Sequence, residues 1–395
     1  MDYLVIARKY RPQTFTEVAG QEVVARTLTN AIRKGRLAHA YLFTGPRGVG
    51  KTSMARILAK ALSCTGPDGS RTQPSDAPCG VCDHCRMITD STHPDVAEID
   101  AARFTGVDAI RDLADGAAFA PAQARFRIFI LDEVHMLSTS AWNALLKVLE
   151  EPPPHVRFIF ATTEVDKVLE TVLSRVQRFD FRPLDQDAIV RRLREIADKE
   201  GASALPDSAL NRIARAAGGG MRDAQTLLDQ LIAVSDGEPE ADLDLLLGAA
   251  RGDDLVAVAD ALIAGTPAPA LEALDRICAG GVAPATFIEQ LVDHVRAVLL
   301  VQACGAASPA VTRLGAQVAA AEAHAKRMPS ERAQRMCQVL INAQQQLRHG
   351  VDPRLLAELT VVRLASLANL VDIDQLLRRL ERLEAAPPAA PPRPR

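Results

Sequence analysis

The stretch Gly45-Pro46-Arg47-Gly48-Val49-Gly50-Lys51-Thr52 decides the fold of this 395-residue chain. It fits the pattern G-x-x-x-x-G-K-[ST] of a phosphate-binding loop, in which glycines let backbone N–H groups surround phosphate oxygens. The apolar run at residues 40–44 predicts a buried strand before it, and residues 53–62 predict a helix after it. This context favours a nucleotide site over a chance glycine turn. Lys51 is expected to reach the β- and γ-phosphates, and the Thr52 hydroxyl to ligate Mg²⁺.

Composition and charge exclude several classes of protein. The chain is 48% hydrophobic and 24% charged, which is typical of a folded globular protein and argues against wholesale disorder. Its formal net charge of −3 argues against a uniformly basic nucleic-acid binder. No apolar run reaches the roughly 18 residues of a membrane span, and the N-terminus lacks a secretory apolar region. We therefore expect a cytoplasmic protein of two or three domains, in which thiols stay reduced.

Four cysteines follow the phosphate loop with the spacing C-x14-C-x2-C-x2-C; they are Cys64, Cys79, Cys82 and Cys85. Four thiolates can close a tetrahedral Zn²⁺ site, and the C-x2-C spacing lets neighbouring ligands converge on one ion. We predict a structural zinc module over about residues 64–90. A redox function of the cysteines is the alternative. His84 lies among them and is expected to be solvent-exposed rather than a ligand.

A second motif combines an apolar run with two acids. Residues 127–131 predict a buried strand that ends in Asp132 and Glu133. In an α/β sheet, ligands bind at the carboxyl ends of the strands. We expect Asp132 to hold the Mg²⁺ shell and Glu133 to polarise the attacking water. The alternative is an ordinary strand end whose acids cap the next helix.

Three further segments carry weaker signals. A strand predicted at residues 157–161 ends in Thr162 and Thr163, where a hydroxyl could sense the γ-phosphate through the attacking water. Arg175 could serve the nucleotide of a neighbouring subunit, or be an ordinary exposed side chain. The basic and aromatic stretch at residues 8–15 could wrap the base of the nucleotide, or pack as an N-terminal arm.

Beyond residue 182 the periodicity predicts only helices. Residues 183–241 are expected to form three helices, with Asp185 and Asp207 as N-caps and Arg222 in the first turn after a triple glycine. Residues 242–371 show apolar spacing typical of helices and are expected to form an assembly domain. Residues 372–395 contain a short helical piece followed by a Pro/Ala-rich linker.

These motifs recur together in one family. They are the opening segment 8–12, the phosphate loop, the four cysteines, residues 131–137, residues 143–153, the Ser174-Arg175 pair and residues 220–224. On these motifs the chain resembles, over about residues 3–370, the gamma/tau subunits of bacterial DNA polymerase III, which are AAA+ ATPases. The resemblance implies an α/β P-loop AAA+ domain over residues 1–182 with a zinc-binding insertion. It further implies a helical lid domain over 183–241, an all-α collar over 242–371 that holds a five-membered ring, and a C-terminal helix and linker over 372–395.

The resemblance also implies a function. Members are ATP-hydrolysing motor subunits of the replicative clamp loader, which opens the ring-shaped sliding clamp and closes it around primed DNA as part of the DNA polymerase III holoenzyme. The implied cofactors are ATP, Mg²⁺ and Zn²⁺. The implied partners are other clamp-loader subunits (delta, delta-prime and further gamma/tau copies), the sliding clamp and primer–template DNA. A longer tau C-terminal region would add the polymerase core and the replicative helicase; no membrane is implied.

Individual residues take roles from the same resemblance. Thr163, with Thr162 less favoured, matches sensor 1; Arg175 matches the arginine finger that reaches the ATP of the adjacent subunit. Arg103 and Thr105 would track the DNA backbone. The implied catalytic set is Lys51, Asp132, Glu133, Thr163, Arg175 and Arg222, the last being sensor 2. The implied nucleotide-binding set is Tyr10, Arg11, Pro12, Gly45, Pro46, Arg47, Gly48, Val49, Gly50, Lys51, Thr52 and Ser53.

The chain differs from the usual family sequence at two places, and two alternative functions remain open. Val176 stands where the family usually has Cys after the Ser-Arg pair, and Phe104 and Gly106 stand where basic or polar residues are common. One alternative is another AAA+ enzyme such as a Holliday-junction motor, which lacks the four-cysteine insertion. The other is a non-hydrolysing structural ring subunit, against which the intact phosphate loop and acids count.

Overall fold

The structure is a computed structural model that describes residues 4–103, 107–234, 239–248, 252–308, 311 and 317–369. The expected DNA contact Thr105, the departures Phe104 and Gly106, and the expected C-terminal helix and linker lie outside these ranges. Two compact units, Met1–Pro239 and Glu240–Arg395, are each described by themselves.

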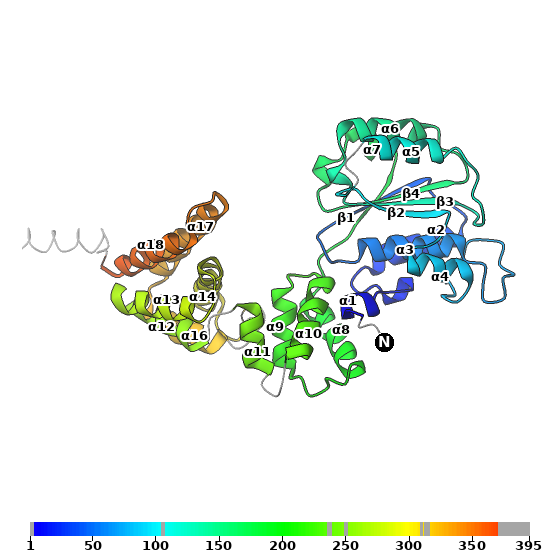
Figure 1. The fold of residues 1–395 in the computed structure, drawn as a ribbon. Coiled ribbons are helices and arrows are strands. Elements are labelled where there is room, and N and C mark those ends of the chain that lie inside the picture. The colour runs from blue at the N-terminus through cyan, green and yellow to red at the C-terminus, as the bar shows by residue number, and fades with distance from the viewer. Residues whose placement is uncertain are drawn as a thin grey trace, which may run out of the picture. The chain divides into compact units, whose positions relative to one another are not determined.

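The first unit is built on a five-stranded parallel sheet with the order β2-β3-β4-β1-β5 (Figure 1). Because every strand runs the same way, the carboxyl ends of all five meet at one edge. The register of β1 against β4 pairs Thr44 with Thr162 at that edge, and β2 against β3 pairs Asp100 with Asp132. The strands are β1 (Ala40–Thr44), β2 (Val96–Asp100), β3 (Arg127–Asp132), β4 (Val156–Thr162) and β5 (Gln177–Asp180).

Helices cover both faces of this sheet, as expected for parallel strands that are apolar on both sides. Figure 1 shows α5, α6 and α7 on one face and α2, α3 and α4 on the other. On the first face, Trp142 of α6 is buried against Phe160 of β4, with ring centroids 5.5 Å apart. These helices are α2 (Glu22–Arg33), α3 (Lys51–Ser63), α4 (Asp83–Asp90), α5 (Val107–Gly116), α6 (Thr139–Glu150) and α7 (Glu170–Leu173).

Short elements complete the sheet domain. The N-terminal arm contains α1 (Ile6–Lys9) and η1 (Phe15–Glu17). The turns η2 (Val134–Met136) and η3 (Val165–Lys167) follow β3 and β4 at the carboxyl edge of the sheet. Polar residues that follow β3, namely Glu133 and His135, therefore contact Thr163 and Glu164, which follow β4.

Three helices follow the sheet: α8 (Gln186–Lys199), α9 (Asp207–Ala216) and α10 (Met221–Val234). The apolar stripe of α8, including Ile189, Leu193 and Ile196, is fully buried. Asp185 is the N-cap of α8, but the expectation that Asp207 caps α9 is wrong. Pro206 occupies that N-cap, because the Asp207 carboxylate lies one position inside the helix and pairs instead with Arg194.

The second unit is helical throughout its described part. Its core gathers around α14, whose Phe287, Leu291, Val295 and Val298 are at most 1% exposed. The elements are α11 (Pro239–Leu247), α12 (Gly252–Ala264), α13 (Pro267–Ala279), α14 (Pro284–Cys304), α16 (Gln317–Arg327), α17 (Ser330–Arg348), α18 (Pro353–Ser366) and η4 (Leu367–Asn369). In the part of the chain that the structure describes, no helix is long and apolar enough to cross a membrane.

Candidate functional site

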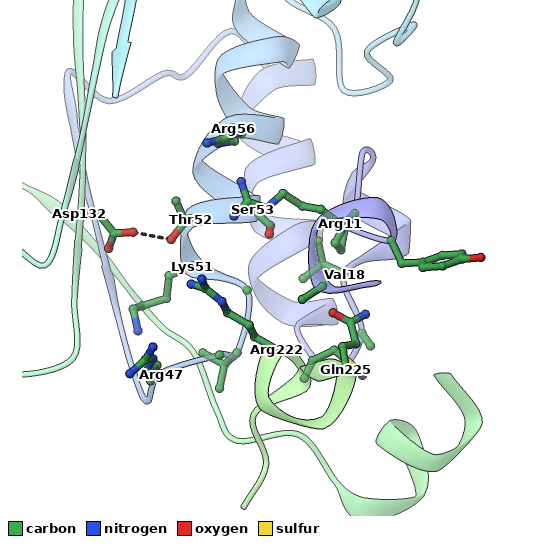
Figure 2. Close-up of a pocket in the computed structure, with 18 of the residues that line it drawn as sticks. Arg11, Val18, Arg47, Lys51, Thr52, Ser53, Arg56, Asp132, Arg222 and Gln225 are labelled. Carbon is green, nitrogen blue, oxygen red and sulfur yellow. Dashed lines mark hydrogen bonds between the residues drawn. The ribbon is translucent and has the colours of Figure 1, made fainter. Parts of the chain in front are cut away.

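A cavity of about 570 Å³ opens at the carboxyl edge of the sheet, between the phosphate loop, the N-terminal arm and α10 (Figure 2). The sequence-predicted residues that line it are Tyr10, Arg11, Pro12, Arg47, Gly48, Val49, Gly50, Lys51, Thr52, Ser53, Asp132, Glu133 and Arg222. Side chains from segments up to about 200 positions apart in the sequence therefore surround one space.

Glycine is required at two points of the phosphate loop. Gly45 has φ +139°, and a Cβ there would lie 2.4 Å from the carbonyl oxygen of Phe181. Gly48 has φ +79°, and a Cβ there would lie 3.2 Å from the Cα of Gly220. The Gly48 carbonyl also accepts a 3.4 Å hydrogen bond from the backbone N–H of Arg222. The loop is thus shaped by close backbone approach on both sides.

Lys51 is a buried cation, only 6% exposed, at the start of α3. Its Nζ donates to the carbonyl oxygens of Gly45 and Pro46, at 2.6 and 2.7 Å. Gly45 and Pro46 thus hold the ammonium through their backbone, rather than lining the cavity themselves. Burial lowers the pKa of Lys51, and the nearby carboxylates of Glu133 and Asp132 oppose that shift.

The Thr52 hydroxyl and Asp132 join the loop to the end of β3. Thr52 Oγ1 donates to Asp132 Oδ2 over 2.6 Å (dashed in Figure 2), and Asp132 Oδ1 accepts the backbone N–H of Glu133 at 2.9 Å. A hydroxyl and a carboxylate in contact form an oxygen pair of the kind that Mg²⁺ prefers. These two side chains therefore fit a shared magnesium ion.

Glu133 leaves the strand in a left-handed backbone conformation, with φ +52°. Its Oε2 lies 3.4 Å from the hydroxyl of Thr163. The hydroxyl of Thr162 turns elsewhere, to the backbone N–H of Glu164 at 3.0 Å and to Nδ1 of His135 at 3.1 Å. Of the two threonines at the end of β4, Thr163 is the one that contacts Glu133.

The N-terminal arm forms the opposite wall of the cavity. Tyr10 Oη donates a 2.5 Å hydrogen bond to Glu200, at the end of α8, and Lys9 pairs with the same carboxylate at 2.7 Å. Burial, together with repulsion from Arg56 and other cations, lowers the pKa of Arg11. Figure 2 shows Arg222 directed from α10 toward the phosphate loop. Arg11, Arg56 and Arg222 therefore all line the cavity beside the phosphate loop, and Arg56 is paired there with Glu98 at 2.7 Å.

Two predicted functional arginines lie outside the cavity. Arg175 follows α7 and pairs with Glu150 at the end of α6, with Nη2 to Oε1 at 2.9 Å. The same guanidinium donates to the Thr171 carbonyl at 2.6 Å. Arg103 is 83% exposed and lies 3.5 Å from Asp100. Each is on the surface, where a second molecule can reach it.

The four cysteine sulfurs lie within 4.8 Å of one another, close to the separation of about 3.8 Å that tetrahedral Zn–S bonds impose. Cys64 and Cys85 are fully buried. Burial opposes ionisation of Cys82, but hydrogen bonds from the backbone of Cys85 and Thr65 lower the pKa of its thiol to about 6. Burial raises the pKa of Cys85. The donor set and its geometry fit a zinc ion.

One expectation around these sites is wrong, and two residues there, Arg125 and His135, were not predicted from the sequence. His84 is half-buried, not exposed as expected, because its ring stacks on His93 and bonds to it at 2.8 Å. Arg125 connects the cysteine module to α3 by donating to the carbonyls of Leu62 and Cys64. His135 lies beside Glu133. The sequence marks these two residues only by position: Arg125 precedes the buried strand β3, and His135 follows Asp132 and Glu133.

Family models match successive parts of the chain. The model described as DNA polymerase III, delta subunit, matches residues 20–185, and that of the clamp loader subunit ATPase lid domain matches residues 188–237. The model of DNA polymerase III subunits gamma and tau domain III matches residues 239–380. The chain belongs to the gamma/tau family of DNA polymerase III subunits. This confirms the expected family and the α/β AAA+ fold with a helical lid and a helical C-terminal region.

Relatives of this gamma/tau family member align with nearly all of it. The DNA polymerase III subunit tau of Bacillus subtilis is 40% identical, over 93% of this chain and 64% of its own length. That of Escherichia coli is also 40% identical, over 92% of this chain and 55% of its own length. The gamma/tau subunit of Mycobacterium tuberculosis is 39% identical, over 91% and 62%. The chain therefore spans between about half and two thirds of these relatives.

Solved structures similar to this gamma/tau family member include more distant proteins. The RuvB Holliday junction branch migration motor of Thermotoga maritima aligns at 17% identity and a TM-score of 0.44, over 64% of this chain and 79% of that one. The DNA clamp loader delta protein of Bacillus subtilis aligns at 14% identity and a TM-score of 0.34, over 87% and 99%. The family assignment from sequence favours a polymerase III subunit over a Holliday-junction motor.

Proposed function

We propose that this chain is an ATP-hydrolysing motor subunit of the bacterial replicative clamp loader, which opens the sliding clamp and loads it onto primed DNA within the DNA polymerase III holoenzyme. The observation that carries the proposal is the convergence of Lys51, Thr52, Asp132, Glu133 and Arg222 on one cavity. Membership of the gamma/tau family supports the clamp-loading assignment. The intact set of side chains favours hydrolysis over a purely structural ring subunit.

Each residue has a proposed part in the reaction. The loop backbone and Lys51 bind the phosphates, and Arg222 contacts the γ-phosphate from α10. Thr52 and Asp132 would hold Mg²⁺, which would supply positive charge to neutralise the phosphates. Glu133 polarises the attacking water, and the Thr163 hydroxyl, 3.4 Å away, helps to orient it.

The base side of the nucleotide is assigned to the N-terminal arm. Tyr10, Arg11 and Pro12 would border the adenine, since all three line the cavity and Tyr10 is fixed to Glu200. Arg175 would act in trans, on the nucleotide of the next subunit, because it lies on the surface away from the cavity of its own chain. A ring of such subunits then has its active sites at the subunit boundaries.

The other assignments follow the same proposal. The domains are an AAA+ domain over residues 1–182 with a structural zinc module near 64–90, a lid over 183–241, a collar over 242–371, and a C-terminal helix and linker over 372–395. The partners are delta, delta-prime and further gamma/tau subunits, the clamp and primer–template DNA, with the polymerase core and replicative helicase added by a longer tau form. Arg103 is proposed to contact the DNA backbone, and the protein to act in the cytoplasm.

ATP turnover in the assembled complex tests this function. The wild-type chain is combined with its partner subunits, and hydrolysis is measured alone, with the clamp, with primed DNA, and with both. We expect the highest rate with both. A Glu133→Gln variant in the same complex should bind ATP and lose turnover. A rate that neither clamp nor primed DNA raises would overturn the clamp-loader assignment and favour the structural ring subunit or another motor.

A further inference from the structure

A buried imidazole lies between two carboxylates at the carboxyl edge of the sheet. The side chain of His135 is 9% exposed. Its Nδ1 lies 3.5 Å from Glu133 Oε2, and its Nε2 lies 3.4 Å from Glu164 Oε1. His135 belongs to η2 and is not part of the cavity wall, whereas Glu133 is. Any influence of His135 on the reaction therefore passes through Glu133.

The ring of His135 is held on both edges. Its Nδ1 also lies 3.1 Å from Oγ1 of Thr162, the fully buried last residue of β4. That hydroxyl is fixed in turn by the backbone N–H of Glu164, at 3.0 Å. Glu164 pairs with Lys167 at 2.9 Å, and this hydrogen bond, with a smaller contribution from His135, lowers the pKa of the Glu164 carboxyl. The imidazole thus has fixed neighbours that belong to β4 and the turn after it.

The carboxylate of Glu133 depends on such a neighbour for its direction. A glutamate side chain has three rotatable bonds, and a general base works only when it is aimed at the proton that it removes. Two side chains approach its Oε2 from the end of the sheet: Thr163 at 3.4 Å and His135 at 3.5 Å. The left-handed backbone of Glu133, with φ +52°, directs the start of the side chain. The two side-chain contacts act on its end.

We propose that His135 is a positioning residue for Glu133. The Nδ1 edge of the ring restrains the carboxylate, while Thr162 and Glu164 restrain the ring. The orientation of the Glu133 carboxylate therefore depends on the position of Thr162 at the carboxyl end of β4. Thr163, which also contacts Glu133, directly follows the same strand end. This inference rests on the proposed function, in which Glu133 polarises the attacking water.

Three substitutions of His135 test the proposal in the complete complex with clamp and primed DNA. His135→Asn keeps a polar group near the position of Nδ1, His135→Gln keeps one near Nε2, and His135→Leu keeps neither. For His135→Leu we expect kcat to fall by up to about 10²-fold, since misplacement of a catalytic group by about 1 Å has an effect of that size. ATP affinity, measured by equilibrium titration, should stay within about twofold of wild type. His135→Asn should recover most of kcat and His135→Gln little of it.

Controls separate this role from a structural one. His155→Leu removes a ring that bonds to backbone carbonyls of Ala117 and Phe119, and should leave kcat unchanged. Equal kcat in His135→Leu and wild type overturns the proposal. So does recovery by Gln but not Asn, or a parallel loss of ATP affinity and thermal stability. The Glu133→Gln variant distinguishes the two levels: if it keeps full turnover, the proposed role of Glu133 itself fails, whatever the His135 variants do.

Discussion

Thr52 of the phosphate loop and Asp132 of β3 are joined by a hydrogen bond of 2.6 Å, although 80 positions separate them in the sequence. The bond ties the first turn of α3 to the carboxyl end of a neighbouring strand. It places the two proposed magnesium ligands in direct contact. Both side chains are therefore oriented by one another within the protein itself.

Thr52→Val removes the hydroxyl and keeps the shape of the side chain. We expect the variant to bind ATP with little response to Mg²⁺, because one proposed oxygen ligand is gone and Asp132 has lost its partner. Thr52→Ser, which keeps the hydroxyl, should behave like wild type. Nucleotide titrations with and without Mg²⁺ measure this. A Thr52→Val chain that responds to Mg²⁺ as wild type does would contradict the shared magnesium site.

Arg175→Ala should leave ATP binding by the isolated chain nearly intact and lower hydrolysis in the complex by about 10³-fold, the lower end of the range for an arginine finger. The reason is that Arg175 lies on the surface, paired with Glu150 outside the cavity of its own subunit. Arg178→Ala is the matched control, since Arg178 is a nearby surface cation paired with Asp180. Equal turnover in the Arg175 variant and wild type would remove the assignment in trans.

Arg222→Ala should weaken ATP binding to the isolated chain. A hydrogen bond to a charged group is worth about 1.5–3 kcal/mol, so the dissociation constant should rise by about 10- to 100-fold. Fluorescent-nucleotide titration measures the change, and ADP should be affected less than ATP. Arg191→Ala, on the exposed side of α8, serves as the control. A similar loss for ADP and ATP would place Arg222 away from the γ-phosphate.

Metal analysis tests the cysteine cluster. A Cys79→Ser/Cys82→Ser double variant should lose the one zinc ion per chain that we expect in wild type, and its melting temperature should fall because the ligands hold the module together. Cys278→Ser, in α13 outside the cluster, should keep the metal. Full zinc content in the double variant would refute the site.

The second unit should lose stability in mild acid. His294 is 3% exposed and bonds to His324 at 2.7 Å, and burial, reinforced by His324, lowers the pKa of His294 to about 4. Below pH 6.5 the unfolded chain binds a proton that the folded chain does not, so stability decreases as the pH falls from 6.5 toward 4. Between pH 7 and pH 5 this amounts to about 2 kcal/mol.

Urea unfolding at pH 7 and pH 5 measures that loss. His294→Gln keeps a hydrogen-bonding group and cannot titrate, so its midpoint should change less between the two pH values. His349→Gln, at an exposed position, should behave like wild type. An unchanged pH response in His294→Gln would assign the acid sensitivity to other groups.

The sequence predicted the elements whose signals are local. The buried strand at β1, the acids that end β3 and the apolar stripe of α8 are visible in a few adjacent residues, and the structure has strands and a helix there. β5 was missed because its residues alternate poorly; only Phe179 is buried on this edge strand. The helix α4 was not predicted, because the interpretation of residues 64–90 rested on the cysteine spacing and not on helical periodicity.

The parts of the site that sequence reasoning missed depend on pairings between distant segments. Tyr10 and Glu200 are 190 positions apart, and nothing in either neighbourhood marks the other. Arg125 contacts carbonyls, which carry no side-chain signal in a sequence. The contact of His135 with Glu164 joins residues that follow two different strands, β3 and β4, so it could not be predicted from either segment alone. Contacts of this kind become visible only when the arrangement of these segments in space is known.

The helix α3 has a different proposed ligand at each of its two ends. It starts at Lys51, in the phosphate loop, and Cys64 of the cysteine cluster is its C-cap. Thirteen helical residues make a rod of about 20 Å. We expect oxidation of the cysteines, or loss of a metal bound there, to destabilise the C-terminal turn of α3, the helix whose N-terminal turn lines the proposed ATP site. The cysteine module therefore adjoins the far end of the helix that starts in the phosphate loop, and we expect removal of a bound zinc ion to weaken nucleotide binding without any change in a residue that lines the cavity.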